Sequence, residues 1–258
     1  MYNAFFAHGG FCLSGTAIQP SLNLYQLRRT CGTCSLSELC LPMGLQSADM
    51  QRLEELVTLR GPVNEGEHLF RIGDPLRVLY AVRGGFFKSY LIEANGREQV
   101  LGFHLPGELI GLDAIWPEKH QCSAVALNTA SVCELPYAGI ADLGRQVPGL
   151  QHSMLRLLSK ELALSHSLAG DFSAEERVAG FLLSLSSRMK ERGYSHTHLT
   201  LAMSRRDIAN YLRLATETVS RVFSRFEQDG LVSVDRRDVT LHDPEKLAQM
   251  GRCFSASW

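Results

Sequence analysis

The 258-residue sequence has no long run of apolar residues. None approaches the ~20 residues that a membrane-spanning helix needs. The segment Met1–Thr30 has no basic start, and Gly9, Gly10 and Gly15 interrupt its apolar residues, which does not fit a secretory signal peptide. With 45% apolar and 21% charged residues, the composition is that of a globular protein. These features predict a cytoplasmic protein without a membrane partner.

The sequence also lacks an excess of either charge. Its 26 basic residues nearly balance 27 acidic ones, and the net charge is -1. Even the segment Ser204–Trp258 carries nine Lys or Arg against eight Asp or Glu. A bulk positive field, which attracts nucleic acid, is therefore absent. Contact with nucleic acid must depend on where individual arginines lie.

Cysteine, in contrast, is abundant. Seven cysteines are many for a cytoplasmic protein, and an odd number leaves no complete disulfide pairing. Cys31, Cys34 and Cys40 form a Cys-x2-Cys-x5-Cys run around Gly32. Their spacing alone leaves three interpretations open: an iron–sulfur cluster with a fourth ligand from elsewhere, a zinc site, or a redox-active dithiol.

Two short helical patterns occupy Ser204–Gly230 and meet near Arg213. Ser204 is placed to cap the first, with Asp207 three residues later as in a capping box. In the second, apolar residues recur at helical spacing on one side, which suits burial. These residues are Val219, Val222, Phe223 and Phe226. The pattern fits a helix-turn-helix or an ordinary helical hairpin.

The second helix is polar on another face near its start. Glu217, Ser220 and Arg221 lie at i, i+3 and i+4, so their side chains reach one target together. Two short alternating strands follow around the turn Asp235–Asp238, and His198–Leu201 supplies a third. These features favour a winged helix-turn-helix that reads the major groove of DNA.

The run Glu217-Thr218-Val219-Ser220-Arg221 resembles the recognition helix of the CRP/FNR family of bacterial transcription regulators, in particular its FNR branch. The resemblance implies an inverted-repeat site close to TTGAT-N4-ATCAA. Arg221 is expected to contact guanine, Glu217 to accept from cytosine, and Ser220 to lie near thymine. The full expected set of DNA contacts is Glu217, Ser220, Arg221, Arg205, Arg206, Thr218 and Arg225.

The turn between the two helices departs from the family pattern. Arg213 stands where the family usually has glycine, and Ala215 stands where it has a capping Ser or Thr. A lost cap costs ~1 kcal/mol. We therefore expect a slightly altered turn within the same fold, with Thr216 as an alternative cap.

The three clustered cysteines resemble, in number and spacing, the N-terminal cluster-binding segment of FNR-type regulators. The resemblance implies an oxygen-labile [4Fe-4S] cluster. Cys133 and Cys122 compete as fourth ligand, with Cys12 and Cys253 more remote. Strand alternation places Cys133 with Leu135 on one face, whereas Cys122 follows a polar loop and is expected to be more exposed. The run from Val132 to Pro136 looks like the family segment with the distant ligand, so the expected set is Cys31, Cys34, Cys40 and Cys133.

Short strands separated by turn signals fill the region from about Met50 to Ala141, and Asn95-Gly96 marks a hairpin. They predict an antiparallel roll or barrel, which resembles the cyclic-nucleotide-binding β-roll of the same family. The expected strands are His68–Ile72, Val78–Val82, Phe86–Ile92, Gln99–His104, Ser123–Leu127 and Ser131–Leu135.

Cyclic-nucleotide sensors of this family hold the phosphate with an Arg-Ser dipeptide after a Gly-Glu segment. Gly107-Glu108 is present here, but no arginine lies between Arg97 and Arg145. A phosphate without its guanidinium would lose a charge-assisted pair. We therefore expect the roll to be a scaffold that no longer binds a cyclic nucleotide.

The pattern becomes helical from Pro148. One apolar stripe has Glu161 in its middle, and a neighbouring stripe consists of Leu155, Leu158 and Leu162. Two adjacent apolar faces indicate contact with the roll and with a partner helix, as in a coiled-coil dimer. Glu161 would meet its symmetry mate and oppose pairing. The expected dimer residues are Leu150, Met154, Leu157, Glu161, Leu164 and Leu168.

The sequence therefore predicts an α+β protein with four segments. Residues 1–46 carry the cluster cysteines, 47–145 form the β-roll, 146–172 form the dimerisation helix and a hinge at Gly170–Phe172, and 173–258 form the winged helix-turn-helix. A capping box at Ser173 and Glu176 begins the last. The resemblance implies a homodimeric, oxygen-responsive transcription regulator whose partners are promoter DNA and RNA polymerase.

Two other classes remain as alternatives. One is a nucleotide-gated regulator, which the missing Arg-Ser disfavours. The other is an enzyme with a cysteine nucleophile. That enzyme would need Cys31 or Cys122 beside a fixed histidine base, and no motif supplies one. We therefore expect the protein not to be an enzyme.

Overall fold

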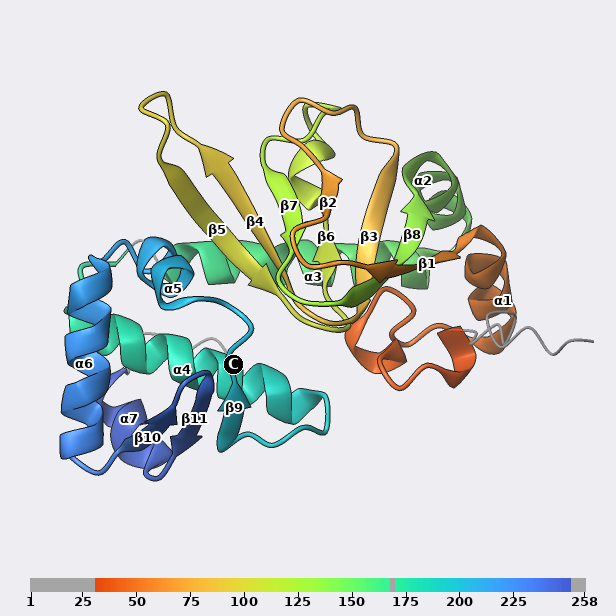
Figure 1. Ribbon diagram of the computed structural model, residues 1–258. Coiled ribbons are helices and arrows are strands. Elements are labelled where there is room, and N and C mark those ends of the chain that lie inside the picture. Colours follow the sequence, from red (N-terminus) through yellow and green to blue (C-terminus); the bar gives the residue numbers. More distant parts are fainter. Residues whose placement is uncertain (1–30, 168–169, 252–258) are drawn as a thin grey trace, which may run out of the picture.

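The computed structural model describes residues 31–167 and 170–251, and it contains an antiparallel β-roll, a long helix and a winged helix-turn-helix (Figure 1). This confirms the predicted α+β class. In Figure 1 the long helix α3 (Pro148–Ser167) passes behind the strands of the roll, and the C-terminal domain lies below them. Among the described residues, no helix combines the length and the apolar character needed to cross a membrane.

The roll consists of two four-stranded antiparallel sheets, ordered β1-β8-β3-β6 and β2-β7-β4-β5. Buried side chains between them include Phe70, Phe87 and Val132. All six expected strands are present. The eight strands are β1 (Thr58–Val63), β2 (His68–Phe70), β3 (Val78–Gly84), β4 (Phe87–Ile92), β5 (Glu98–His104), β6 (Leu109–Ile110), β7 (Ser123–Ala126) and β8 (Ala130–Pro136).

Two strands and two helices of this region were not expected from the sequence. Strand β1 contains Gly61 and Pro62 and shows no alternation of buried and exposed residues, and β6 has only two residues. The helices α1 (Ser47–Leu56) and α2 (Tyr137–Gln146) flank the roll. The expected hairpin joins β4 to β5 through residues 93–97, with Gly96 at φ +80°.

The long helix α3 packs against its own roll along the stripe that was expected to form the dimer. Leu150 is 1% exposed within the core, and Met154 and Leu157 pack against the same cluster. The exposed apolar positions are Leu155 and Leu162, at 59% and 58%. In the single chain, the start of the first stripe thus belongs to the core of the roll, and Leu155 and Leu162 of the neighbouring stripe face outward. The dimer residues stay a prediction. Leu168 lies outside the described residues.

The C-terminal domain has the expected winged helix-turn-helix arrangement. Its sheet order is β10-β11-β9, and the expected capping boxes at Ser173 and Ser204 are both confirmed. The elements are α4 (Ala174–Glu191), β9 (His198–Thr200), α5 (Arg205–Tyr211), α6 (Thr216–Gln228), β10 (Val232–Asp235), β11 (Asp238–Leu241) and α7 (Pro244–Met250).

Strand β5 of the roll forms part of the hydrophobic core of this C-terminal domain. Val100, Phe103 and Leu105 belong to the same buried cluster as the apolar residues of α4, α5 and α6. Asn210 on α5 accepts a hydrogen bond from the amide of Val100 (2.6 Å) and donates one to the carbonyl of Glu98. The two domains therefore share one core along the edge strand of the second sheet.

The turn between α5 and α6 keeps its fold despite the two departures from the family pattern. Arg213 is exposed and adopts φ +56°, a left-handed conformation that costs an L-residue roughly 1–2 kcal/mol. Ala215 is the N-cap residue of α6 and provides no side-chain cap. Thr216 is the first residue of the helix, so the expectation that it caps α6 is wrong.

This strain gives a stability prediction. Arg213→Gly should raise the free energy of unfolding by roughly 0.5–1 kcal/mol, because relief of the left-handed strain exceeds the entropy that glycine loses on folding. Urea unfolding monitored by circular dichroism would measure the change. Arg213→Ala is the matched control, since it removes the same charge but keeps the strained conformation. An equal gain in both variants would contradict the prediction.

Candidate functional site

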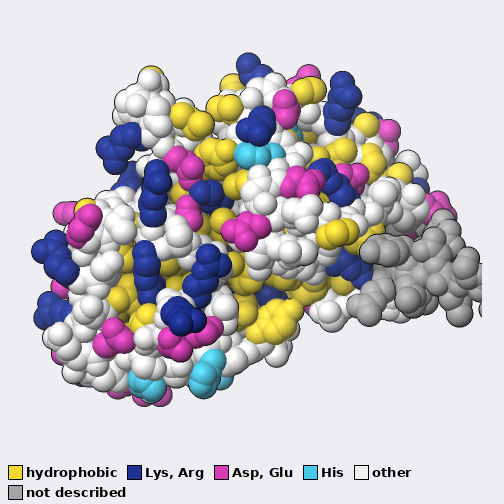
Figure 2. All heavy atoms as spheres, in the orientation of Figure 1, with side chains coloured by type: hydrophobic (Ala, Val, Ile, Leu, Met, Phe, Trp, Pro, Cys, Tyr) yellow, Lys and Arg dark blue, Asp and Glu magenta, His cyan; other side chains and the backbone are white. Residues whose placement is uncertain are grey.

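Helix α6 presents its polar triplet to solvent, as expected. Its apolar face is buried, with Val219 and Phe226 at 0% exposure. Glu217, Ser220 and Arg221 are all exposed near the start of the helix. Figure 2 shows Lys and Arg side chains on the side of the molecule that α5 and α6 form, interspersed with acidic ones. The burial of one face therefore orients the other outward, where it could enter a DNA groove.

The other expected DNA contacts differ in their surroundings. Arg206 is exposed, and Arg225 is exposed but forms an ion pair with Glu175 at 2.9 Å. Thr218 is partly buried and accepts a hydrogen bond from Arg221 Nη2 at 3.3 Å. These three side chains lie on α5 and α6 at the outer side of the domain, so they remain candidates for phosphate or base contacts.

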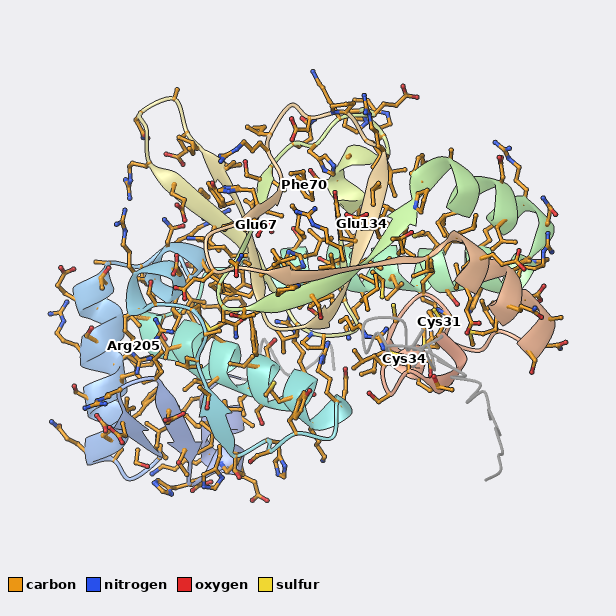
Figure 3. All side chains as sticks on the ribbon, turned by 45° about the vertical axis from the view of Figure 1, so that its right-hand side comes forward. Cys31, Cys34, Glu67, Phe70, Glu134 and Arg205 are labelled. Atoms are coloured by element: carbon orange, nitrogen blue, oxygen red, sulfur yellow. The ribbon has the colours of Figure 1, made fainter. Side chains whose placement is uncertain are left out.

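Arg205 occupies a different environment from these residues (Figure 3). Its guanidinium lies 3.6 Å from the ring centroid of Phe223, a cation–π contact between α5 and α6. Burial lowers the pKa of Arg205, and its Nη1 is a buried atom without a hydrogen-bond partner in the described part of the chain. The side chain therefore contributes to the packing of α5 against α6.

A single pocket is lined by all four expected ligands, Cys31, Cys34, Cys40 and Cys133. The first three come from a segment that contains two short 3₁₀ turns, Cys31–Thr33 and Ser37–Leu39, and Cys133 comes from β8. Figure 3 shows Cys31 and Cys34 together on that segment. The remaining lining is almost entirely apolar and includes Leu41, Leu53 and Leu135.

The cysteine segment is anchored to the roll and its helices. Leu36 and Leu41 are buried, at 8% and 1% exposure. The amide of Gly32 donates to Glu54 Oε1 on α1 at 2.8 Å, and Ser153 Oγ on α3 donates to the carbonyl of Met43 at 2.9 Å. These contacts hold three thiols opposite the fourth without any covalent link, since all four cysteines are free.

Burial raises the pKa of three of these thiols, those of Cys31, Cys40 and Cys133. It raises the pKa of Cys31 to about 11 and that of Cys40 to about 12. The pKa of Cys133 is also raised by burial, against a lowering effect of Arg83. Thiols with such pKa values are neutral at pH 7 and poor nucleophiles. They become thiolates when a metal cation binds them, so the pocket suits a metal cofactor better than covalent catalysis.

The donor set has the chemistry of an iron–sulfur cluster site, since all four side chains are free thiols. Within residues 31–251, no three His, Cys, Asp or Glu side chains are grouped to hold one metal ion. In a [4Fe-4S] cluster each iron takes one thiolate, so the four sulfurs need not converge on one point. Four free thiols line one pocket, which is a donor set of the kind that such a cluster uses.

Cys122 lies elsewhere, in the interior of the roll. It is 5% exposed, and its thiol donates to Asp113 Oδ2 at 3.5 Å. The expectation that Cys122 would be more exposed than Cys133 is therefore wrong, because Gln121 and Cys122 both donate hydrogen bonds to Asp113 in the turn Leu112–Ala114. Cys122 does not line the cysteine pocket. Cys12 and Cys253 lie outside the described residues.

Glu161 on α3 faces the C-terminal end of α4 within its own chain. It lines a pocket with Glu108 and Arg192, and burial raises its pKa to about 7, with the charge of Glu108 adding to the effect. The folded state therefore binds more protons than the unfolded state between pH 4.5 and 7. Stability from this group is full below pH 4.5 and is lost as the pH rises to 7.

We therefore expect the free energy of unfolding of Glu161→Gln to exceed that of the parent by on the order of 1–3 kcal/mol above pH 7. Near the pKa of a free glutamate, the two proteins should have the same free energy of unfolding. Urea unfolding at a series of pH values would measure the difference. Glu38→Gln, at an exposed position, is the control and should leave the pH dependence unchanged. A difference for Glu161→Gln that is the same at every pH would contradict this assignment.

Comparison with known proteins agrees with this geometry. Residues 61–146 match the cyclic nucleotide-binding domain and residues 176–250 match the Crp-like helix-turn-helix domain. Among solved structures, FixK2 from Bradyrhizobium japonicum has a TM-score of 0.68 and 27% identity, covering 75% of this chain and 96% of that one.

Two relatives match at higher identity. Transcriptional activator protein anr of Pseudomonas aeruginosa is 45% identical over 223 residues, which cover 85% of this chain and 91% of that protein. The fumarate and nitrate reduction regulatory protein of Escherichia coli is 40% identical over 223 residues, covering 85% and 89%. Both are named as regulatory proteins and neither as an enzyme. The chain therefore belongs to the CRP/FNR family of DNA-binding transcription regulators, in the branch of Anr and the fumarate and nitrate reduction regulator.

Proposed function

We propose that this protein is a cytoplasmic, oxygen-responsive transcription regulator that binds promoter DNA as a homodimer and acts on RNA polymerase. The observation that carries the proposal is the presence, in one chain, of a pocket lined by four cysteines and an exposed recognition face. Four partly buried thiols around one pocket, in a chain that also has a winged helix-turn-helix, support a cofactor-dependent regulator.

Cys31, Cys34, Cys40 and Cys133 would hold a [4Fe-4S] cluster, which when bound supplies sensitivity to oxygen. Three of these residues belong to the N-terminal segment and the fourth to β8. Ligation by all four would fix the segment against the roll, beside the helix α3. Without a metal partner, the raised pKa values of Cys31 and Cys40 favour neutral thiols, which add no link between the segment and β8.

The proposed dimer contact is the exposed stripe of α3, with Leu155 and Leu162 at its centre. A dimer of this kind would place two copies of α6 in successive major grooves, about 34 Å apart. The proposed site is an inverted repeat close to TTGAT-N4-ATCAA, read by Glu217, Ser220 and Arg221.

A cyclic nucleotide is not part of the proposal. The interior of the roll is filled by side chains, with Phe70 stacked on His120 at 3.5 Å between ring centroids. Glu108, which survives from the Gly-Glu segment, forms ion pairs with Arg188 and Arg192. Both features support the proposal that the roll is a scaffold.

Anaerobic purification with iron and sulfide analysis, before and after exposure to air, tests the function. We expect a straw-brown protein with roughly four iron and four sulfide per chain, which loses colour and affinity for the inverted repeat in air. A colourless anaerobic protein that contains one zinc ion per chain would show that the four cysteines form a structural zinc site and not a cluster site. A colourless protein that binds DNA only with a cyclic nucleotide would favour the nucleotide-gated class.

A further inference from the structure

The turn between β5 and β6 carries a carboxylate that two arginines of the C-terminal domain clamp. Arg188 donates from Nε to Glu108 Oε1 at 2.9 Å and from Nη2 to Oε2 at 2.5 Å. Arg192 donates from Nη2 to Oε1 at 2.6 Å. Their side chains are 10% and 1% exposed, and that of Glu108 is 13% exposed. This is a buried, bidentate ion pair between the two domains, the strong class of charged contact.

The same arginines also hold the backbone of the turn. Arg188 Nη2 donates to the carbonyl of Phe103 at 2.6 Å, and Arg192 Nε donates to that of Pro106 at 2.5 Å. The amide of Leu105 donates to Glu108 Oε2 at 3.0 Å. Burial opposes ionisation of Glu108, but the pairing with Arg188 outweighs it and lowers the pKa to about 2. The carboxylate therefore stays charged, and α4 is tied to this turn.

The opposite side of the turn contacts the cysteine segment. A Cβ built on Gly107 would lie 3.1 Å from Leu39 Cβ and 3.8 Å from Leu36 Cβ, and Gly107 has φ +91°. Leu36 and Leu39 lie between Cys34 and Cys40. Leu39 also lines the pocket that contains Glu108 and Arg192. One three-residue turn, Pro106–Glu108, thus lies between the cysteine segment and α4.

We infer that Glu108 is a positioning residue that couples the placement of the cysteine segment to the orientation of the DNA-binding domain. The inference deepens the proposed function and rests on it. With the segment in place, Leu36 and Leu39 pack over Gly107 and keep the turn where Glu108 meets Arg188 and Arg192. Release of the segment uncovers the turn and loosens α4. The polar contacts that Asn210 and Lys88 form between the roll and α5 do not involve the cysteine segment.

Glu108→Gln tests the coupling, because it keeps the shape of the side chain and removes its charge. In anaerobic protein we expect the visible absorbance of the parent. On a duplex containing TTGAT-N4-ATCAA, we expect the ratio of affinities before and after air exposure to fall by about tenfold or more. The control is Glu67→Gln, which removes a carboxylate from an ion pair with Arg60 on the surface of the roll (3.0 Å) and should keep the ratio. A parental or larger ratio in Glu108→Gln overturns the inference.

A second measurement does not depend on the cluster. In protein kept under nitrogen, whether coloured or not, hydrogen exchange of α4 and β5 amides should be faster in Glu108→Gln than in Glu67→Gln, with unchanged exchange in β3 and β8. Equal exchange in α4 overturns the inference even if the parent is colourless, whereas a colourless parent alone overturns the proposed function. If Glu108→Gln does not fold, Arg192→Lys replaces it as the test, because it keeps the charge but loses the planar guanidinium. It should give a smaller fall in the affinity ratio and a smaller increase in α4 exchange. Parental behaviour of that variant counts against the inference.

Discussion

Replacing Cys133 by alanine should abolish both the visible absorbance of the anaerobic protein and its binding to the inverted repeat. Cys133 is the only one of the four pocket cysteines that belongs to the roll and not to the N-terminal segment. Its loss would leave three thiols, all on one segment, facing apolar side chains. Such a set cannot fix the segment against β8. Absorbance spectra and gel-shift titrations under nitrogen would measure both effects.

Cys122→Ala is the matched control for this prediction. Cys122 is also a buried cysteine of the roll, but its thiol donates to Asp113 and it does not line the pocket. Its removal should leave colour and DNA binding intact, at the cost of a small cavity in the roll. A coloured, DNA-binding Cys133→Ala protein would refute the ligand set, and loss of colour in Cys122→Ala alone would move the fourth ligand to Cys122.

Arg221→Ala should weaken binding to the matching site by about 1–3 kcal/mol and relax the preference at one base pair. Arg221 lies on the exposed face of α6, one residue after Ser220 and four after Glu217. Its side chain is long enough to reach a guanine edge, where the guanidinium can donate to O6 and N7 together. Binding titrations against a panel of single-base variants of TTGAT-N4-ATCAA would show which base pair loses its preference.

Arg206→Ala serves as the control for sequence reading. Arg206 is exposed at the start of α5, the helix that crosses the backbone in this type of domain. A phosphate contact there should weaken binding to all sequences alike and reduce its salt dependence. If Arg221→Ala also weakens every site equally, it does not read a base.

Patterns within a few consecutive residues predicted the six strands and the starts of two helices. Each of the six expected strands lies between glycine, proline or asparagine turns, and the capping boxes at Ser173 and Ser204 mark helix starts because their hydrogen bonds join residues three apart. The alternation around Cys133 was informative for the same reason. Neighbouring side chains on a strand must point to opposite faces, whatever packs against them.

The orientation of α3 could not be predicted in this way. Its two apolar stripes have similar composition, and only the position of the roll decides that Leu150 is buried and Leu155 is exposed. The clamp at Glu108 is a second example, because Arg188 and Arg192 are one helical turn apart but their partner lies 80 residues away. Contacts between distant segments depend on how whole elements pack, which a single sequence does not encode locally.

The burial of β5 in the core of the C-terminal domain limits how regulators of this type can be recombined. A cut near residue 173 divides the chain between two folding motifs, but it does not divide their hydrophobic core, because Val100, Phe103 and Leu105 stay on the other side. A chimera that joins this winged helix-turn-helix to a foreign roll would leave an apolar surface on α4 and α5 without its cover. Core substitutions on β5 must therefore be combined with compatible substitutions on α4 and α5.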